Sequence, residues 1–203
     1  MSKYLTSFTI GALLHEESTQ IIPLLLHDDN EGIEAEIITG NLTKINAQAS
    51  RKRKILEIKR RFEQSDNSLW EYFINASASE QKAILYYNCL KTYQILQDFH
   101  IEILMDKWSK YDLELTNTDY SSFLFSKSDQ HPEILEWTTN TQTKLIQIAK
   151  LMLKEVGILE GNKLRQLYLP DSFWEFFINM GELWYLEAMF LNINDIKKLI
   201  SKR

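Results

Sequence analysis

The stretch Ser79–Lys110, SEQKAILYYNCLKTYQILQDFHIEILMDKWSK, decides the fold class of this chain. It contains no glycine and no proline, and its apolar residues recur every three or four positions, as on one face of an α-helix. The pattern predicts core helix here, either as one long helix or as two helices that meet end to end. The apolar positions of the stripe are Ala83, Ile84, Tyr87, Leu90, Ile95, Phe99, Ile103 and Leu104.

The composition of the rest of the chain agrees with a helical fold. The 203 residues include only 6 glycines and 3 prolines, which leaves few of the turns that a sandwich or barrel needs. AVILMFWYC residues make up 44% of the sequence, enough to fill a sizeable core. We therefore expect an all-α protein with room for one small β-hairpin, folded as one domain or as two small ones.

Upstream of that stretch, the sequence predicts a helix from Asn46 to about Gln64 that is rich in cations. The chain as a whole has a formal charge of −5, but residues 51–61 hold seven basic residues and only one acid, Glu57. At 100° per residue, Ile55, Ile58 and Phe62 form one narrow stripe that would anchor the helix. The cations fall on the remaining circumference: Arg51, Lys52, Arg53, Lys54, Lys59, Arg60 and Arg61.

This cationic helix favours phosphate binding. A charged face that only aids solubility is the commoner explanation for a basic helix, but these cations move an acidic protein toward neutrality. The shorter helix predicted at Ile33–Ile38, which ends at Gly40, precedes it. The pair is similar to a DNA-binding helix-turn-helix, although an ordinary helical hairpin is the more frequent arrangement. Earlier still, Pro23 should kink or restart the helix predicted from Thr9 to Leu26.

Downstream, the stretch Tyr111–Asp129 is rich in Ser, Thr, Asn and Asp and predicts a boundary between two domains, residues 1–112 and 113–203. The second half then holds a helix, Thr139–Val156, stopped by Gly157. Two short β-type runs follow, Ile158–Glu160 and Leu164–Leu169, on either side of Gly161-Asn162. A helix followed by such a hairpin is typical of a winged helix. Its turn is a second candidate for DNA contact, through the flanking cations Lys163 and Arg165.

An aromatic tail ends the chain. Most of its aromatic residues fit a helical core stripe, but Trp174 lies off that stripe and could dock another subunit. The aromatic residues of the tail are Phe173, Trp174, Phe176, Phe177, Trp184, Tyr185 and Phe190.

Catalytic and metal sites find little support. Cys89 and His100 share a helical face but lie ~16 Å apart along it, too far for a thiolate and its base. The lone cysteine excludes a thiolate zinc site, and Thr19 stands where a zinc-binding HExxH motif starting at His15 needs its second histidine. We expect a protein that is not an enzyme, with no cofactor, no metal and no small-molecule substrate. No apolar run reaches the ~18 residues of a membrane span, so we also expect a cytoplasmic location.

Four segments together resemble the BrxA family of the bacterial BREX phage-defence systems. They are YLTSFTIGALLHEESTQIIPLLL at residues 4–26, ASRKRKILEIKRRF at 49–62, LKTYQILQDF at 90–99 and WTTNTQTKLIQIAKLMLKEVGIL at 137–159. The resemblance implies an all-helical protein whose N-terminal part is similar to the antitermination factor NusB. It also implies DNA binding within a multi-subunit defence machinery. Pro23 departs from the family pattern, which has a helix former there.

Two hypotheses of function follow. The leading one is a DNA-binding subunit of a phage-defence complex, holding double-stranded DNA by phosphate contacts from the helix Asn46–Gln64, with little reading of sequence. The rival is an adaptor that docks other defence subunits through its winged half and its aromatic tail. In the rival hypothesis the cationic helix is incidental or meets an acidic partner.

Overall fold

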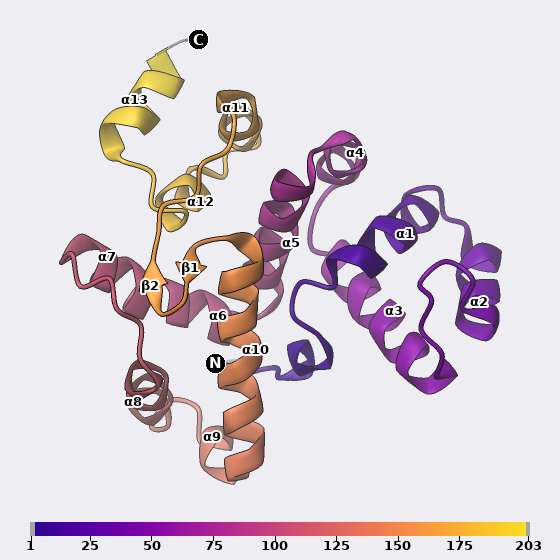
Figure 1. The fold of residues 1–203 in the computed structure, drawn as a ribbon, viewed down its shortest axis with the longest axis horizontal. Coiled ribbons are helices and arrows are strands. Elements are labelled where there is room, and N and C mark those ends of the chain that lie inside the picture. Colours follow the sequence, from indigo (N-terminus) through magenta and orange to yellow (C-terminus); the bar gives the residue numbers. More distant parts are fainter. Residues whose placement is uncertain (1–2, 202–203) are drawn as a thin grey trace. The chain divides into compact units, whose positions relative to one another are not determined.

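The computed structural model describes residues 3–201, and the chain divides into two compact units (Figure 1). One unit holds residues 5–94. The other holds residues 95–201 together with residues 3–4. The division lies earlier than the boundary predicted at residue 112, because the helical segment after residue 95 packs inside the C-terminal unit. There His100 Nε2 donates a 2.7 Å hydrogen bond to the carbonyl of Ala188.

The N-terminal unit is helical throughout its regular structure. The helix α3 contacts α1, α2, α5 and the 3-10 turn η1, so its inner side is covered by the rest of the unit. The core between these helices is aromatic and aliphatic, with Trp70, Phe73 and Tyr87 fully buried. The elements are η1 (Ser7–Ile10), α1 (His15–Leu26), α2 (Asn30–Thr39), α3 (Gln48–Phe62), α4 (Asn67–Asn75) and α5 (Ala78–Thr92).

Pro23 neither splits nor restarts the first helix. α1 continues through Pro23 and ends three residues later at Leu26, where the His27 amide bonds back to the Pro23 carbonyl at 3.2 Å. Pro23 has no N–H to donate to the Thr19 carbonyl, so α1 lacks that one backbone hydrogen bond and continues past it. Of the two alternatives, one helix through Pro23 or a restart at Pro23, the structure has the first.

The long apolar stretch that set the fold class forms successive helices rather than one. α5 starts with a capping box between Ser77 and Glu80 and ends before Tyr93, which takes an extended conformation. The helical path then resumes in α6 (Gln94–Phe99), continues in the π-helical segment η2 (His100–Met105) and ends in α7 (Asp106–Ser109). The prediction of core helix along this stretch is confirmed, with the break at Tyr93.

The C-terminal unit adds further helices and one small sheet. Its longest helix, α10 (Thr139–Val156), is capped by Gly157. That residue has φ +93°, and its amide donates hydrogen bonds to the carbonyls of Leu153 and Lys154. The further elements are α8 (Asn117–Lys127), α9 (Glu133–Glu136), α10 (Thr139–Val156), β1 (Leu159–Glu160), β2 (Lys163–Leu164), α11 (Asp171–Asn179), α12 (Leu183–Ala188) and α13 (Ile193–Ser201). The fold is thus all-α with one β-hairpin, as the sequence predicts.

The hairpin is antiparallel, with Leu159 opposite Leu164 and Glu160 opposite Lys163, and Gly161 at φ +60° makes its turn. A third segment, residues 113–115, lies beside β2. The Leu115 amide donates to the Asn162 carbonyl at 2.7 Å, and the Leu164 amide donates to the Leu113 carbonyl at 2.8 Å. No pattern in the sequence predicted this third segment. The second predicted strand, Leu164–Leu169, overlaps β2 (Lys163–Leu164) at Leu164 alone.

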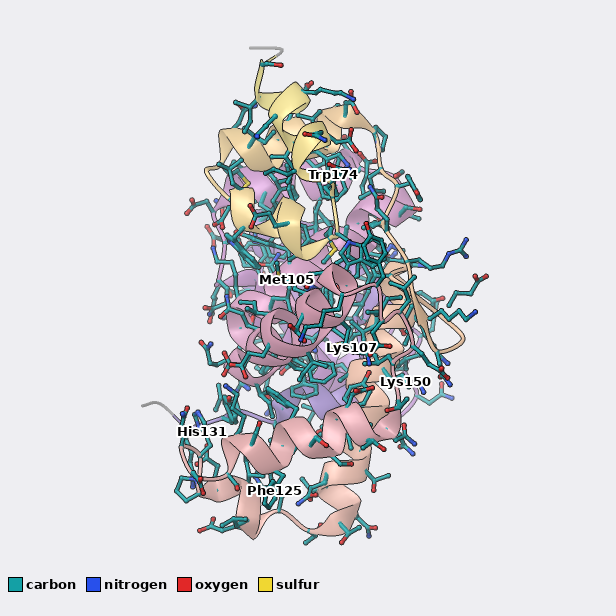
Figure 2. The ribbon with its side chains drawn as sticks, turned by 90° about the vertical axis from the view of Figure 1, so that its left-hand side faces the viewer. Met105, Lys107, Phe125, His131, Lys150 and Trp174 are labelled. Carbon is teal, nitrogen blue, oxygen red and sulfur yellow. The ribbon has the colours of Figure 1, made fainter. Side chains whose placement is uncertain are left out.

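The aromatic tail is core. Trp174 is 3% exposed and packs edge-on against Phe173 at 4.9 Å, so the predicted docking surface at Trp174 is wrong (Figure 2). The stripe predicted from the sequence left Trp174 outside the core, but the stripe that α11 buries is Phe173, Trp174, Phe177 and Ile178, which includes it. Contacts of α11 with α12 and with α13 provide this cover.

His100 gives the C-terminal unit a pH-dependent stability. Complete burial lowers the pKa of His100 to about 4, so the unfolded chain takes up its proton near pH 6.5 while the folded chain does not. Stability is therefore lost as the pH falls from about 6.5 toward 4. Between pH 7 and 5.5 we expect a loss of about 1 kcal/mol. Urea denaturation at both pH values measures it.

The control for this prediction is a pair of histidine variants. His100→Gln has no proton to exchange at this position, so its stability should change little between pH 7 and 5.5. His27 is exposed, and His27→Gln should keep the full dependence of the wild type. Equal pH dependence in wild type and His100→Gln would show that another group is responsible.

Candidate nucleic-acid interface

Helix α3 lies at the edge of the N-terminal unit (Figure 1), and four of its cations are exposed. We call these four residues, Lys52, Arg53, Lys59 and Arg60, the cationic face. They lie on the exposed side of the helix, whereas Ile55 and Ile58 are 1% and 2% exposed and pack into the core. The anchoring stripe predicted from the sequence is therefore present, and Phe62 completes it by stacking on Trp70 at 5.1 Å.

Arg51 does not belong to this surface, contrary to the sequence prediction. It is 3% exposed, and its guanidinium donates hydrogen bonds to the carbonyls of Ile37 at 3.0 Å, Ile38 at 2.7 Å and Ile45. These carbonyls lie at the end of α2 and in the loop before α3. Arg51 therefore joins the two helices and cannot reach a phosphate.

Glu36 completes the junction between α2 and α3. Its carboxylate accepts hydrogen bonds from the Leu42 amide at 2.9 Å and from the Thr43 hydroxyl at 2.6 Å. Burial alone would raise the pKa of Glu36, but these hydrogen bonds and the nearby charge of Arg51 hold it below its ordinary value. The loop between α2 and α3 is thus held by two charged side chains, Glu36 from α2 and Arg51 from α3.

Arg61 is also buried, contrary to the prediction. It is 2% exposed, and its Nε donates to Glu57 Oε1 at 2.8 Å. The two Nη atoms donate to the carbonyls of Ala12 at 2.7 Å and Gly11 at 3.1 Å. Arg61 therefore ties the C-terminal end of α3 to the segment that leads into α1.

The sequence already held a signal for both errors. Arg51 lies four residues before Ile55 and seven before Ile58, and Arg61 lies three residues after Ile58. These spacings place both arginines on or beside the buried stripe of the helix. A buried arginine needs carbonyl or carboxylate acceptors from other segments, and the sequence does not reveal where those acceptors will lie.

Glu57 contributes little negative charge to the outer surface. Its side chain is 1% exposed and is paired with Arg61, and it also accepts hydrogen bonds from the hydroxyls of Tyr93 and Ser7. Burial raises the pKa of the Tyr93 phenol, so the phenol stays protonated and acts as a donor. The acid that offset the cations in the sequence is thus neutralised inside the unit.

Two further cations of α3 have partners inside the unit. Lys54 forms a 2.6 Å ion pair with Glu17 of α1, and its side chain is 25% exposed. Arg60 donates to the Ser7 hydroxyl and lies 3.8 Å from Glu57, but its side chain remains 46% exposed. Arg60 therefore stays on the cationic face, whereas Lys54 projects from the other side of the helix, toward α1.

The hairpin turn is the second predicted contact, and its charges are balanced. Lys163 and Arg165 are both exposed, but Arg165 is paired with Glu160 and Lys163 lies opposite Glu160 and Glu114 in the sheet. On the preceding helix α10, Lys150, labelled in Figure 2, is half-buried, whereas Lys144 and Lys154 are exposed. The N-terminal cationic face is the stronger of the two candidates.

Within residues 3–201, no three side chains of His, Cys, Asp or Glu gather into a group that could hold a metal ion. The same range contains no helix with the length and apolar character that crossing a bilayer requires.

Comparisons with known proteins place the chain beside one family. Residues 2–180 match the family model described as BrxA. A curated protein from Bacillus cereus (strain H3081.97), named "BREX protein BrxA", is 24% identical over 131 residues, which is 64% of this chain and 66% of that protein. The crystal structure of an uncharacterized protein from Magnetospirillum magneticum shares the fold with a TM-score of 0.77. That match has 19% identity and covers 93% of this chain and 98% of the other.

Proposed function

This chain belongs to the BrxA family, and from that membership we propose that it is a cytoplasmic, non-enzymatic DNA-binding subunit of a BREX phage-defence complex. Double-stranded DNA is held by phosphate contacts from the cationic face of α3. One observation carries the proposal. Four exposed cations share one side of a helix in a chain whose formal charge is −5.

The charge arrangement around α3 supports phosphate binding. The acid within the cationic stretch, Glu57, is buried against Arg61, so it does not offset the potential outside the helix. Lys52 and Lys59 are seven residues apart, which is ~10.5 Å along the axis at a rise of ~1.5 Å per residue. That separation allows them to address different phosphates of a duplex. Glu63 is exposed just beyond Phe62 and limits the face at that end.

The helix is also held firmly in place. Arg51 fixes its start to the end of α2, and Arg61 fixes its end to residues 11–13. Cations on a fixed scaffold lose less freedom on binding than cations on a mobile loop, which favours affinity. The two buried arginines thus contribute to binding indirectly, by positioning the four exposed cations.

The C-terminal unit supports a second candidate function, the docking of other defence subunits. We infer a winged-helix-like fold for it, because its elements follow one another in the order of that motif. These are the helical segment from α6 to α7, the strand-like segment 113–115, then α8, α10 and the hairpin. Phe125, labelled in Figure 2, and Leu135 are 81% and 73% exposed, and a partner that covered them would bury apolar area. The likeness of the N-terminal unit to NusB stays a prediction.

The dependence of binding on salt tests the proposal. Each phosphate contact steepens the fall of log K with log salt by about 0.9, so four contacts predict a slope of about −3.6 for wild-type protein and a random duplex. Fluorescence anisotropy at several salt concentrations measures this slope. A slope near zero, or no binding at low salt, would contradict phosphate binding and make subunit docking the leading function.

A further inference from the structure

Leu56 lies in the middle of the cationic face and is 51% exposed. On a helix surface, the neighbours of a residue are those three and four positions away in either direction. For Leu56 those four positions are all cations, namely Lys52, Arg53, Lys59 and Arg60. An exposed leucine is unremarkable by itself, but one enclosed by four cations on a fixed helix needs an explanation.

The cations stand in two pairs on opposite sides of Leu56. At 100° per residue, Lys52 and Lys59 lie about 40° and 60° to one side of it. Arg53 and Arg60 lie about 60° and 40° to the other side. The helix therefore presents an apolar ridge with a row of positive charge along each flank.

The core does not account for Leu56. Ile55 and Ile58 provide the buried contacts of α3, and Arg51 and Arg61 tie both of its ends to other segments. Because the helix cannot rotate without breaking these contacts, Leu56 stays on the outside. Its half-exposed side chain is free to be covered by a ligand of complementary charge.

The major groove of duplex DNA matches this arrangement. The groove is ~12 Å wide, so it admits a helix, and phosphates line both of its walls. Its floor carries one apolar group, the C5-methyl group of thymine. The minor groove, ~6 Å wide, is too narrow for a helix. A helix in the major groove would place its ridge on the floor and its two flanks against the walls.

We propose that α3 lies in the major groove of duplex DNA and that Leu56 packs against thymine methyl groups on its floor. This inference rests on the proposed function and extends it, because phosphate contacts alone read no sequence. It makes Leu56 a specificity-determining residue that favours thymine-containing sites. The cations then supply affinity, and the leucine supplies a modest preference.

Replacing thymine by deoxyuridine tests the contact. The substitution removes the C5-methyl group from the major groove and leaves base pairing unchanged. Wild-type protein should bind an A·T-rich duplex about fourfold tighter per contacted methyl group than the matching A·U duplex. Leu56→Ala should bind both duplexes equally and keep the wild-type salt slope. Leu42 is 43% exposed and lies outside the cationic face, so Leu42→Ala should retain the preference.

The outcomes separate this inference from the proposed function. Equal affinity of wild-type protein for both duplexes, with a salt slope near −3.6, would overturn the Leu56 contact and leave phosphate binding intact. Leu56→Ala binding both duplexes more weakly by the same factor would also overturn it. No duplex binding would overturn both proposals. Binding to phosphatidylserine vesicles that requires Leu56, without a preference for thymine, would assign the face to a membrane surface instead.

Discussion

Reversing the four residues of the cationic face to glutamate is expected to abolish duplex binding while the protein stays folded. The loss should be on the order of 1,000-fold at 0.1 M salt, because four contacts at about 0.9 each contribute nearly four decades of affinity relative to 1 M salt. The folded state should persist because all four side chains are exposed. Fluorescence anisotropy gives the affinity, and circular dichroism with thermal melting gives the folded state. The four substitutions are Lys52→Glu, Arg53→Glu, Lys59→Glu and Arg60→Glu.

A control with the same change in net charge separates a local effect from a general one. Four exposed lysines lie outside α3, and reversing them should weaken binding far less than reversing the face. If the face variant is folded and binds DNA as tightly as wild type, α3 is not the site, and the hairpin cations Lys163 and Arg165 become the next candidates. The control residues are Lys91, Lys110, Lys197 and Lys198.

Replacing Arg61 by methionine is expected to destabilise the N-terminal unit by about 3 kcal/mol, because it leaves the buried carboxylate of Glu57 without its counter-charge. The carbonyls of Gly11 and Ala12 lose their donors as well. Methionine fills most of the same volume, so the effect reports the lost charge and hydrogen bonds rather than a cavity. Urea denaturation followed by circular dichroism measures the change.

Arg53→Met is the matched control for Arg61→Met, because Arg53 belongs to the same helix and is exposed. It should change stability by less than about 0.5 kcal/mol and weaken duplex binding about eightfold at 0.1 M salt, the effect of one contact. Arg61→Met should do the opposite: it should lower stability strongly and leave duplex affinity nearly unchanged under conditions in which it stays folded. Glu57→Gln added to Arg61→Met should recover part of the lost stability. An Arg61→Met variant as stable as wild type would refute the structural role of Arg61.

The helical fold could be predicted because its signals are local in the sequence. Apolar spacing and the scarcity of glycine and proline predicted the helices, and Gly161-Asn162 predicted the hairpin turn. The segment 113–115 escaped prediction because it is short and its partner, β2, lies far along the chain. Clusters of Ser, Thr, Asn and Asp around it predicted a boundary. There they instead serve as loop and cap residues, such as the capping box of Thr116 and Asp119 at α8.

The candidate site was predictable as a helix but not residue by residue. Lys52, Arg53, Lys59 and Arg60 are exposed as the sequence analysis expected. Arg51 and Arg61 are not, because their acceptors belong to α2 and to residues 11–13. Those contacts form only in the folded unit. A count of charges along the sequence therefore cannot separate the buried arginines from the exposed cations.

Lysine acetylation footprinting, with and without a duplex at low salt, tests most directly whether α3 is the DNA-binding surface. Mass spectrometry compares the reaction rates of lysines in both units in one experiment. If α3 is that surface, duplex should slow the acetylation of Lys52 and Lys59 several-fold and leave Lys144, Lys154 and Lys163 unchanged. Unaltered rates at Lys52 and Lys59 under conditions where the duplex is bound would contradict it.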